Sequence, residues 1–257
     1  MRQLRHLTAT VVVVLLTGIA ALRGQWINVP NTAPKTKDGY VDLAVAAPVA
    51  ADGNSDLSGI WAIDAKGFSE GLADYTAGGL PMQQWAEAVV LERGSNGGAA
   101  TPTARCLPPG IPMNLLSTIV HPLKIVQQPS LIVILYEYFG EFRQIFLDGR
   151  RPEKDPNPTW LGYSIGRWDG KDLIVDSSGF NGKIWLDTAG HPATDALHIT
   201  ERFQRRNYGH LTVRMTIDDP QAYRKPWTVM INMHLVTAGD LLEYVCNENE
   251  KDARHSR

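Results

Sequence analysis

The fold is decided by residues 211–217, which read Leu211-Thr212-Val213-Arg214-Met215-Thr216-Ile217. Apolar and polar side chains alternate strictly along this stretch, so one face of the strand is buried and the other meets water. The next apolar stretch alternates in the same way, with apolar side chains at Trp227, Val229, Ile231, Met233 and Leu235. Two consecutive half-buried strands predict an antiparallel sheet.

Short apolar or alternating stretches of the same kind recur along the rest of the chain. They predict strands at 56–61, 123–127, 131–138, 142–147, 161–168, 173–177, 197–205 and 241–246, in addition to the two above. Asp148-Gly149 and Asp169-Gly170 are typical of tight hairpin turns. No helical crossover separates the strands, which excludes a parallel α/β fold. The sequence therefore predicts a mainly β protein, an antiparallel up-and-down barrel or a sandwich of about nine strands with one or two short helices.

One amphipathic helix is predicted before the main run of strands. Residues 80–93 begin near Pro81 and place Trp85 and Val89 at helical spacing. The prolines and glycine within residues 108–112 then predict an extended passage rich in turns.

Residues 1–25 have the pattern of an export signal. Arg2 and Arg5 precede an apolar run from 7 to 22 that contains no charge, as in secretory signal peptides. A retained membrane anchor formed by residues 7–22 is the alternative, because no clean cleavage motif follows the run. We therefore expect an exported protein, either periplasmic or secreted, with a membrane tether as the second possibility.

The remaining chain is long enough for one domain with a sizeable core. Residues 26–55 are predicted to be a flexible lead-in, because they are rich in Pro, Ala, Asp, Asn and Gly, and residues 56–250 to be a single β-rich domain. The chain has 25 basic and 27 acidic residues, a net charge of −2, with no basic stripe. This balance gives no reason to expect nucleic acid as a partner. The sequence does not predict an oligomeric state.

The chain has two cysteines, Cys106 and Cys246. In an exported protein such a pair predicts a disulfide. It would close a loop of about 140 residues, which chain entropy rewards with about 4–5 kcal/mol. Two buried free thiols are the alternative. Neither cysteine has metal-like spacing to another ligand.

Several motifs resemble those of known families. The first is Gly59-Ile60-Trp61, which resembles the G-x-W signature of lipocalin-like (calycin) barrels. The others are Ala104-Arg105-Cys106-Leu107-Pro108-Pro109-Gly110, Tyr136-Glu137-Tyr138, Ile165-Gly166-Arg167-Trp168-Asp169-Gly170, Gly190-His191-Pro192, Leu197-His198-Ile199-Thr200-Glu201-Arg202-Phe203, Lys225-Pro226-Trp227-Thr228 and Glu243-Tyr244-Val245-Cys246. Together they resemble a large group of secreted bacterial proteins whose function is not established. The resemblance implies export and a β-barrel, and it implies no catalytic residues.

The densest polar stretch runs from residue 176 to residue 202 and holds candidates for acid–base chemistry. His198 is the type of side chain that titrates near neutral pH, and Asp176 on the adjacent strand is placed to orient it. Alternation puts Glu201 among core-facing residues, where a carboxylate is costly unless paired, so we expect an ion pair with an arginine on a neighbouring strand. Tyr136 is placed to hydrogen-bond a ligand oxygen. The alternative is that these groups are hydrogen-bonded pairs that hold a barrel together.

Six further side chains are candidates for contacting a ligand. They are Tyr138, Arg143, Arg167, Trp185, Asp187 and His191. Tyr138 is expected on the same strand face as Tyr136, and the arginines suit a carboxylate or carbonyl group. Trp185 lies in the long connection 178–196, and loops of that length are often functional. A structural role is the alternative for each of them.

No metal or cofactor is expected. His191, Asp195 and His198, with Glu201 as a fourth candidate, are the alternative metal ligands. Their spacing is loose, and His198 and Glu201 point to opposite faces of a strand, so both could bind one ion only across a bulge. The glycines at 94–98 lack the Lys-Ser/Thr of a phosphate loop. No serine stands in a nucleophile elbow.

We expect an exported barrel that acts on a small organic molecule by cofactor-independent acid–base chemistry, as a lyase, isomerase or hydrolase. Its site is expected at a barrel mouth, between the 178–196 connection and the faces of Tyr136, Asp176 and His198. The alternative is a barrel that binds a small ligand without turning it over. An enzyme would hold His198 and a carboxylate within hydrogen-bond distance in a cavity. A binding protein would have a mainly apolar cavity with one or two polar anchors.

Overall fold

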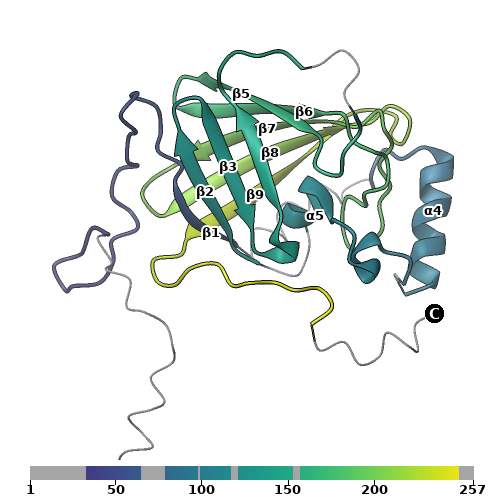
Figure 1. Cartoon of the computed structure of the whole chain (residues 1–257), viewed down its shortest axis with the longest axis horizontal. Coiled ribbons are helices and arrows are strands. Elements are labelled where there is room, and N and C mark those ends of the chain that lie inside the picture. The colour runs from purple at the N-terminus through teal and green to yellow at the C-terminus, as the bar shows by residue number, and fades with distance from the viewer. Residues whose placement is uncertain (1–32, 65–78, 98, 117–120, 153–156, 249–257) are drawn as a thin grey trace, which may run out of the picture. The chain divides into compact units, whose positions relative to one another are not determined.

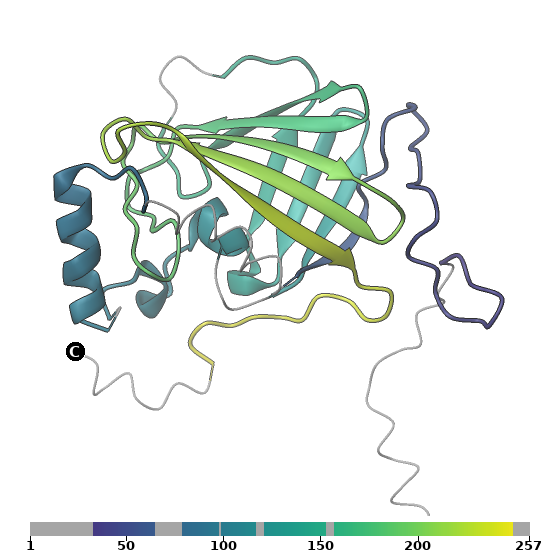
Figure 2. The same ribbon diagram turned by 180° about the vertical axis from the view of Figure 1, so that it is seen from behind.

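Nine strands form a closed barrel in the computed structural model of this protein (Figures 1 and 2). The structure describes residues 33–64, 79–97, 99–116, 121–152 and 157–248. The strands are β1 (Gly59–Ile63), β2 (Leu123–Gln128), β3 (Leu131–Tyr136), β4 (Phe142–Phe146), β5 (Tyr163–Asp169), β6 (Asp172–Ser178), β7 (His198–Arg205), β8 (His210–Asp218) and β9 (Trp227–Leu235). The described residues also form two short α-helices, α4 (Gln84–Ser95) and α5 (Gly110–Leu116), and two 3₁₀ turns, η1 (Pro102–Arg105) and η2 (Tyr138–Gly140). The predicted mainly β barrel with one or two short helices is confirmed.

Strands that are neighbours in the barrel are also neighbours in the chain, and β9 pairs with β1 to close it. Each pairing is antiparallel except that of β4 with β5, which is parallel. The hairpin turn predicted at Asp148-Gly149 is therefore wrong, because strands that run in the same direction need a longer connection. The hairpin predicted at Asp169-Gly170 is confirmed, since Asp169 pairs directly with Asp172 across the turn.

The alternation that predicts the strands also decides which side chains fill the barrel. On β8, Leu211, Val213 and Met215 are fully buried, and Val213 lies opposite the buried Ile231 of β9. A similar pattern recurs on most strands, which direct alternate side chains into one apolar core, while β4, β5, β6 and β7 also place polar side chains inside. Burial of these side chains is the main source of stability.

The helices gather at one end of the barrel, with α5 against it and α4 farther out (Figures 1 and 2). The extended passage predicted over residues 108–112 is wrong from Gly110 onward, because α5 begins there and all seven of its residues are buried. Pro112 is compatible with a helix because it lies in the first turn, where its missing N–H is not needed. Helix α4 begins at Gln84, four residues later than predicted.

Residues 241–246 do not form the predicted strand. The pairing of β1 with β9 leaves no free edge for another strand. The segment instead runs back towards η1, where Cys246 forms a disulfide with Cys106 and the two Cα atoms are 5.7 Å apart. The predicted disulfide is present.

The part of the lead-in that is described, residues 33–55, is hydrogen-bonded to the barrel. The amides of Gly209 and Tyr208 donate to the carbonyls of Leu43 (2.9 Å) and Val45 (2.8 Å). The predicted export segment, residues 1–25, lies outside the described residues. Among the residues described, no helix combines the length and the apolar character needed to cross a membrane.

Candidate functional site

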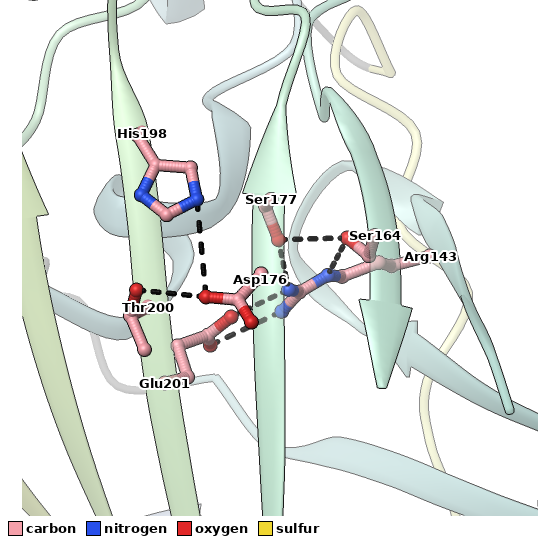
Figure 3. Close-up of polar contacts among 7 residues, drawn as sticks. All are labelled: Arg143, Ser164, Asp176, Ser177, His198, Thr200 and Glu201. Carbon is pink, nitrogen blue, oxygen red and sulfur yellow. Dashed lines mark hydrogen bonds and ion pairs between the residues drawn. The ribbon is translucent and has the colours of Figure 1, made fainter. Parts of the chain in front are cut away.

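His198 and Asp176 lie on the outer face of the barrel wall (Figure 3). His198 Nε2 is 3.8 Å from Asp176 Oδ1, and the two side chains are 44% and 39% exposed. Asp176 also accepts hydrogen bonds from Thr200 Oγ1 (2.9 Å) and from Arg167 Nη1 (2.7 Å). Arg167 is itself 65% exposed. These contacts link β5, β6 and β7 on the surface, where ion pairs contribute little to stability.

The structure does not assemble the site expected from Tyr136, Asp176 and His198. Tyr136 ends β3 and is buried inside the barrel, whereas the other two side chains are on the outer wall. A separation of 3.8 Å is also too long for a hydrogen bond between His198 and Asp176. The expectation that a histidine and a carboxylate are hydrogen-bonded in a cavity is therefore wrong for His198 and Asp176, which lie 3.8 Å apart on the outer wall.

Glu201 is paired inside the barrel, but not with a neighbouring strand as expected. Its partner is Arg143 of β4, which is separated from β7 by β5 and β6. Arg143 Nη2 lies 2.5 Å from Glu201 Oε2, and Nη1 lies 3.1 Å from Oε1. The two side chains are 1% and 0% exposed. The ion pair thus crosses the interior, because alternation directs both side chains inward at the same level of the barrel.

Two serines complete an interior polar cluster, which consists of Arg143, Ser164, Ser177 and Glu201 (Figure 3). Arg143 Nε donates to Ser164 Oγ (2.9 Å) and Nη2 donates to Ser177 Oγ (2.8 Å). The two serine hydroxyls are 2.9 Å apart. A buried charge is tolerated when it is paired and its remaining donors are used, as they are here.

Tyr136 lies in the electrostatic field of this cluster. Burial opposes the charged form of Arg143, but Glu201 and Tyr136 outweigh burial, so the pKa of Arg143 is raised. Burial raises the pKa of Tyr136 to about 12, although Arg143 acts in the opposite direction. The Tyr136 hydroxyl is buried and has no hydrogen-bond partner of standard geometry among the described residues. The interior therefore holds one ion pair beside a neutral phenol.

A cleft opens in the barrel wall where β4 and the chain before β5 separate. The two strands pair only at Ile145 with Ser164 and at Phe146 with Ile165. Before this point the chain is drawn towards the end of β6: the Thr159 amide donates to the Gly179 carbonyl (3.0 Å) and the Thr159 carbonyl accepts from the Asn181 amide (2.9 Å). We call the resulting opening, between residues 141–146 and 159–164, the wall cleft.

Gly162 permits this path of the chain. Its φ is +63°, and a Cβ atom there would lie 2.8 Å from the carbonyl oxygen of Ser178. A larger residue would have to adopt the left-handed conformation and push the segment off β6. The close approach of residues 159–162 to β6 is what leaves β4 uncovered.

The wall cleft has a volume of about 390 Å³ and an aromatic, mainly apolar lining. Its apolar walls are formed by Phe142, Phe146, Trp160, Leu161 and Tyr163. Arg143 and Ser164, both almost fully buried, also line it, so the cleft reaches the interior polar cluster. The volume lies within the range of about 300–1,000 Å³ that small-molecule sites occupy.

Glu141 is the titratable group that distinguishes the wall cleft. It lines the cleft, and its Oε2 accepts a hydrogen bond of 2.8 Å from Asn114 Nδ2 of α5. Burial raises the pKa of Glu141 to about 7, and the hydrogen bond from Asn114 only partly opposes this. A carboxyl group of this kind exchanges between its neutral and charged forms near neutral pH, which allows it either to donate or to accept a proton.

Tyr138 does not share a strand face with Tyr136, and that prediction is wrong. Strand β3 ends at Tyr136, and Tyr138 begins η2. Its ring stacks on His121 at 5.0 Å and meets Tyr244 edge-on at 5.4 Å. Tyr138 therefore helps to hold the carboxyl-terminal segment against η2.

The candidates in the long connection are arranged around a short, buried turn. His191 Nδ1 lies 2.6 Å from Asp187 Oδ2, and the His191 amide donates to Asp187 Oδ1 (3.2 Å). Trp185 is buried and forms an isolated bridge with Pro192. Asp187 and His191 thus fix the turn, and Trp185 lines a second cleft, which is considered below.

The alternative metal ligands His191, Asp195 and His198 are not brought together. Among the described residues, no group of three or more His, Cys, Asp and Glu side chains is arranged to hold a metal ion. His191 is instead directed to Asp187, and His198 to the outer wall.

Sequence reasoning missed Glu141, Asn114, Ser164 and Trp160. One signal was available for Glu141, because it immediately precedes β4 and continues the spacing of two set by the inward-facing Arg143 and Ile145. The others are brought together by the path of connections, which has no periodic pattern in the sequence. No family model matches this chain, and comparison with curated proteins gives no significant match.

Proposed function

We propose that this protein is an exported barrel that binds a small organic molecule in the wall cleft. The observation that carries the proposal is the combination of a cleft of about 390 Å³ with a few polar groups at its inner side. Those groups are Glu141, Arg143 and Ser164. An apolar cleft with few convergent polar anchors is the arrangement expected of a ligand-binding site.

The lining favours a flat ligand with one hydrogen-bonding group. Phe146 stacks with Tyr163 at 5.2 Å and carries the Arg150 guanidinium over its ring at 3.8 Å, so Phe142 and Trp160 are the rings proposed to contact a planar molecule. Glu141 is placed to accept a hydrogen bond from such a molecule when it is ionised and to donate one when it is protonated. Because Arg143 is already paired with Glu201, the carboxyl group of Glu141 is the polar group proposed to form a hydrogen bond with the ligand.

Export is part of the same proposal. It is supported by the charged start and uncharged apolar run of residues 1–22. The disulfide between Cys106 and Cys246 is of a kind that persists in oxidising compartments. A ligand met in the periplasm or outside the cell is therefore proposed.

Indole provides a simple test, because it is flat, neutral and carries one N–H donor. In isothermal titration calorimetry, Phe142→Ala should bind indole about fivefold more weakly than the unchanged protein. The reason is that the exposed ring of Phe142 is part of the cleft wall. Leu91→Ala, which removes another exposed apolar side chain, on α4, is the matched control and should leave the affinity unchanged. Equal affinities of all three proteins would overturn the proposal.

Acid–base catalysis by Glu141 is the second candidate function, and the pKa near 7 is the observation that favours it. Such a carboxyl group suits proton transfer at neutral pH without a cofactor. Any turnover of a small carbonyl or hydroxy compound should then follow one ionisation near pH 7 and disappear in Glu141→Gln. Asp176→Asn should retain it, because Asp176 is on the outer wall. Turnover that survives Glu141→Gln would remove this candidate.

A further inference from the structure

A second cleft, which we call the basic cleft, shares the lining residue Trp160 with the wall cleft. The basic cleft has a volume of about 480 Å³. Three of its lining residues are the cations Arg93, Arg105 and Lys183, and none is a carboxylate. The cations come from three separate parts of the chain: α4, η1 and the connection between β6 and β7.

Arg93 is held in place by the protein. Its Nη1 donates to the carbonyl of Gly190 (2.7 Å), and its guanidinium lies over the ring of Trp185 at 4.3 Å. Gly190 has a φ of +87°, and a Cβ atom there would lie 3.0 Å from Arg93 Cδ. The guanidinium has five N–H donors. Within the described part of the chain, the contact with Gly190 is the one hydrogen bond that it makes.

The three cations differ from several other arginines of the described residues, although Arg205 also is buried and donates to backbone carbonyls alone. Arg143, Arg167 and Arg202 each form an ion pair with a carboxylate. Across the ranges that the structure describes, no carboxylate lies within ion-pair distance of any of the three cations of the basic cleft. Like charges around one hollow repel each other, and an anion between them relieves the repulsion.

We propose that the basic cleft binds an organic anion with a flat apolar body. Its carboxylate would lie among Arg93, Arg105 and Lys183, since guanidinium groups bind carboxylates through paired hydrogen bonds. Its apolar body would pack on Trp160, because one face of Trp185 is taken by Arg93. This site goes beyond the proposed function and does not depend on it, since the anchors of the wall cleft are not among its lining residues.

The test uses 4-fluorobenzoate, followed by its fluorine NMR signal, with the disulfide intact. Arg105→Gln combined with Lys183→Gln should weaken binding by about tenfold or more, because two of three charges are removed. Both side chains are exposed, so the double variant should fold. The matched control removes two exposed cations elsewhere, by Arg214→Gln and Lys225→Gln, and should leave the affinity unchanged. Glu141→Gln should also bind normally, which separates this site from the wall cleft.

Three comparisons decide the outcome. Neutral 4-fluorobenzyl alcohol should bind much more weakly than 4-fluorobenzoate, and equal binding would overturn the role of the cations. Inorganic phosphate should displace 4-fluorobenzoate only weakly; equal or tighter binding of phosphate would contradict an organic ligand. An unchanged affinity in Arg105→Gln with Lys183→Gln would overturn the site itself.

Discussion

Glu141 is a residue whose charge near neutral pH depends on the fold. Its carboxyl group is partly buried between α5 and the wall cleft, and the hydrogen bond from Asn114 only partly offsets the loss of hydration. Burial therefore favours the neutral form in the folded protein. In the unfolded chain the same group has its ordinary pKa and is charged at neutral pH.

This difference predicts a pH dependence of stability. The pKa of Glu141 rises from 4.5 in the unfolded state to about 7 in the folded state. Between these two values the folded protein binds more protons, so the free energy of unfolding falls as the pH rises, by about 3 kcal/mol in total. Glu141→Gln should lose this part of the pH dependence and be the more stable protein at about pH 8. Urea unfolding of both proteins at about pH 5 and about pH 8 measures the free energy of unfolding at each pH. If that free energy changes equally with pH in the two proteins, the assigned pKa of Glu141 is contradicted.

Arg143 and Glu201 should depend on each other for stability. Removing one partner, by Arg143→Met or by Glu201→Gln, leaves the other charged group buried without its counter-ion. Each change should lower the free energy of unfolding by about 3–5 kcal/mol. The double replacement Arg143→Met with Glu201→Leu should cost much less than the sum of the two single changes. Asp169→Asn, which breaks a surface pair with Arg202, is the control and should cost less than about 1 kcal/mol. A single change inside the barrel that costs as little as the control would refute the cluster.

At the scale of residues, the sequence predicts that Glu201 is buried and paired with an arginine, but it does not predict which arginine. Alternation along β7 placed Glu201 among core residues and required a cationic partner. The identity of the partner depends on which strands face each other across the closed barrel, and periodicity carries no such information. His198 and Asp176 show the converse, because their proximity was expected but their place on the outer wall separates them from the wall cleft.

At the scale of elements, the parallel pairing of β4 with β5 creates the wall cleft. Two paired positions hold the strands together, and the hydrogen bonds of Thr159 to residues 179–181 draw the preceding chain away from β4. A hairpin at Asp148-Gly149 would have paired the two strands along their length and closed the wall. The Asp-Gly dipeptide predicts a hairpin turn, but the sequence alone does not show whether the chain turns back or crosses over.

The disulfide is the element that fixes the carboxyl-terminal segment to η1. Replacing both cysteines, by Cys106→Ser with Cys246→Ser, should lower the free energy of unfolding by about 4–5 kcal/mol, because the unfolded chain loses the closure of a loop of about 140 residues. Chemical denaturation of the variant and the oxidised protein measures the difference. A loss below about 1 kcal/mol would mean that the bond does not constrain the unfolded chain.

Helix α5 shows why some elements escaped prediction. Its sequence, Gly110 to Leu116, begins with a glycine and has Pro112 in the first turn, which resembles a loop. Burial of every residue of α5 against the barrel end overrides this weak local preference. Residues 241–246 are the opposite case, because their apolar pattern is typical of a strand but barrel closure leaves no edge to join.

At the scale of the whole described barrel, the strands and the segments that connect them both contribute to the clefts. The wall cleft is lined by residues of β4 and β5 together with residues 159–162. The basic cleft is lined by connecting segments, among them α4, η1 and the connection between β6 and β7. Such segments carry function more often than the strands they join. The barrel could be predicted because the alternation of apolar and polar residues is visible within the sequence of each strand. The clefts could not, because they form where segments distant in the sequence meet.

The most direct test of the proposed function is a crystal structure of the protein, with its disulfide intact, soaked with indole. We expect indole between Phe142 and Trp160 in the wall cleft, with its N–H directed to the carboxylate of Glu141 at hydrogen-bond distance. Indole bound only elsewhere, or an empty wall cleft at a concentration that saturates binding in solution, would contradict the proposal.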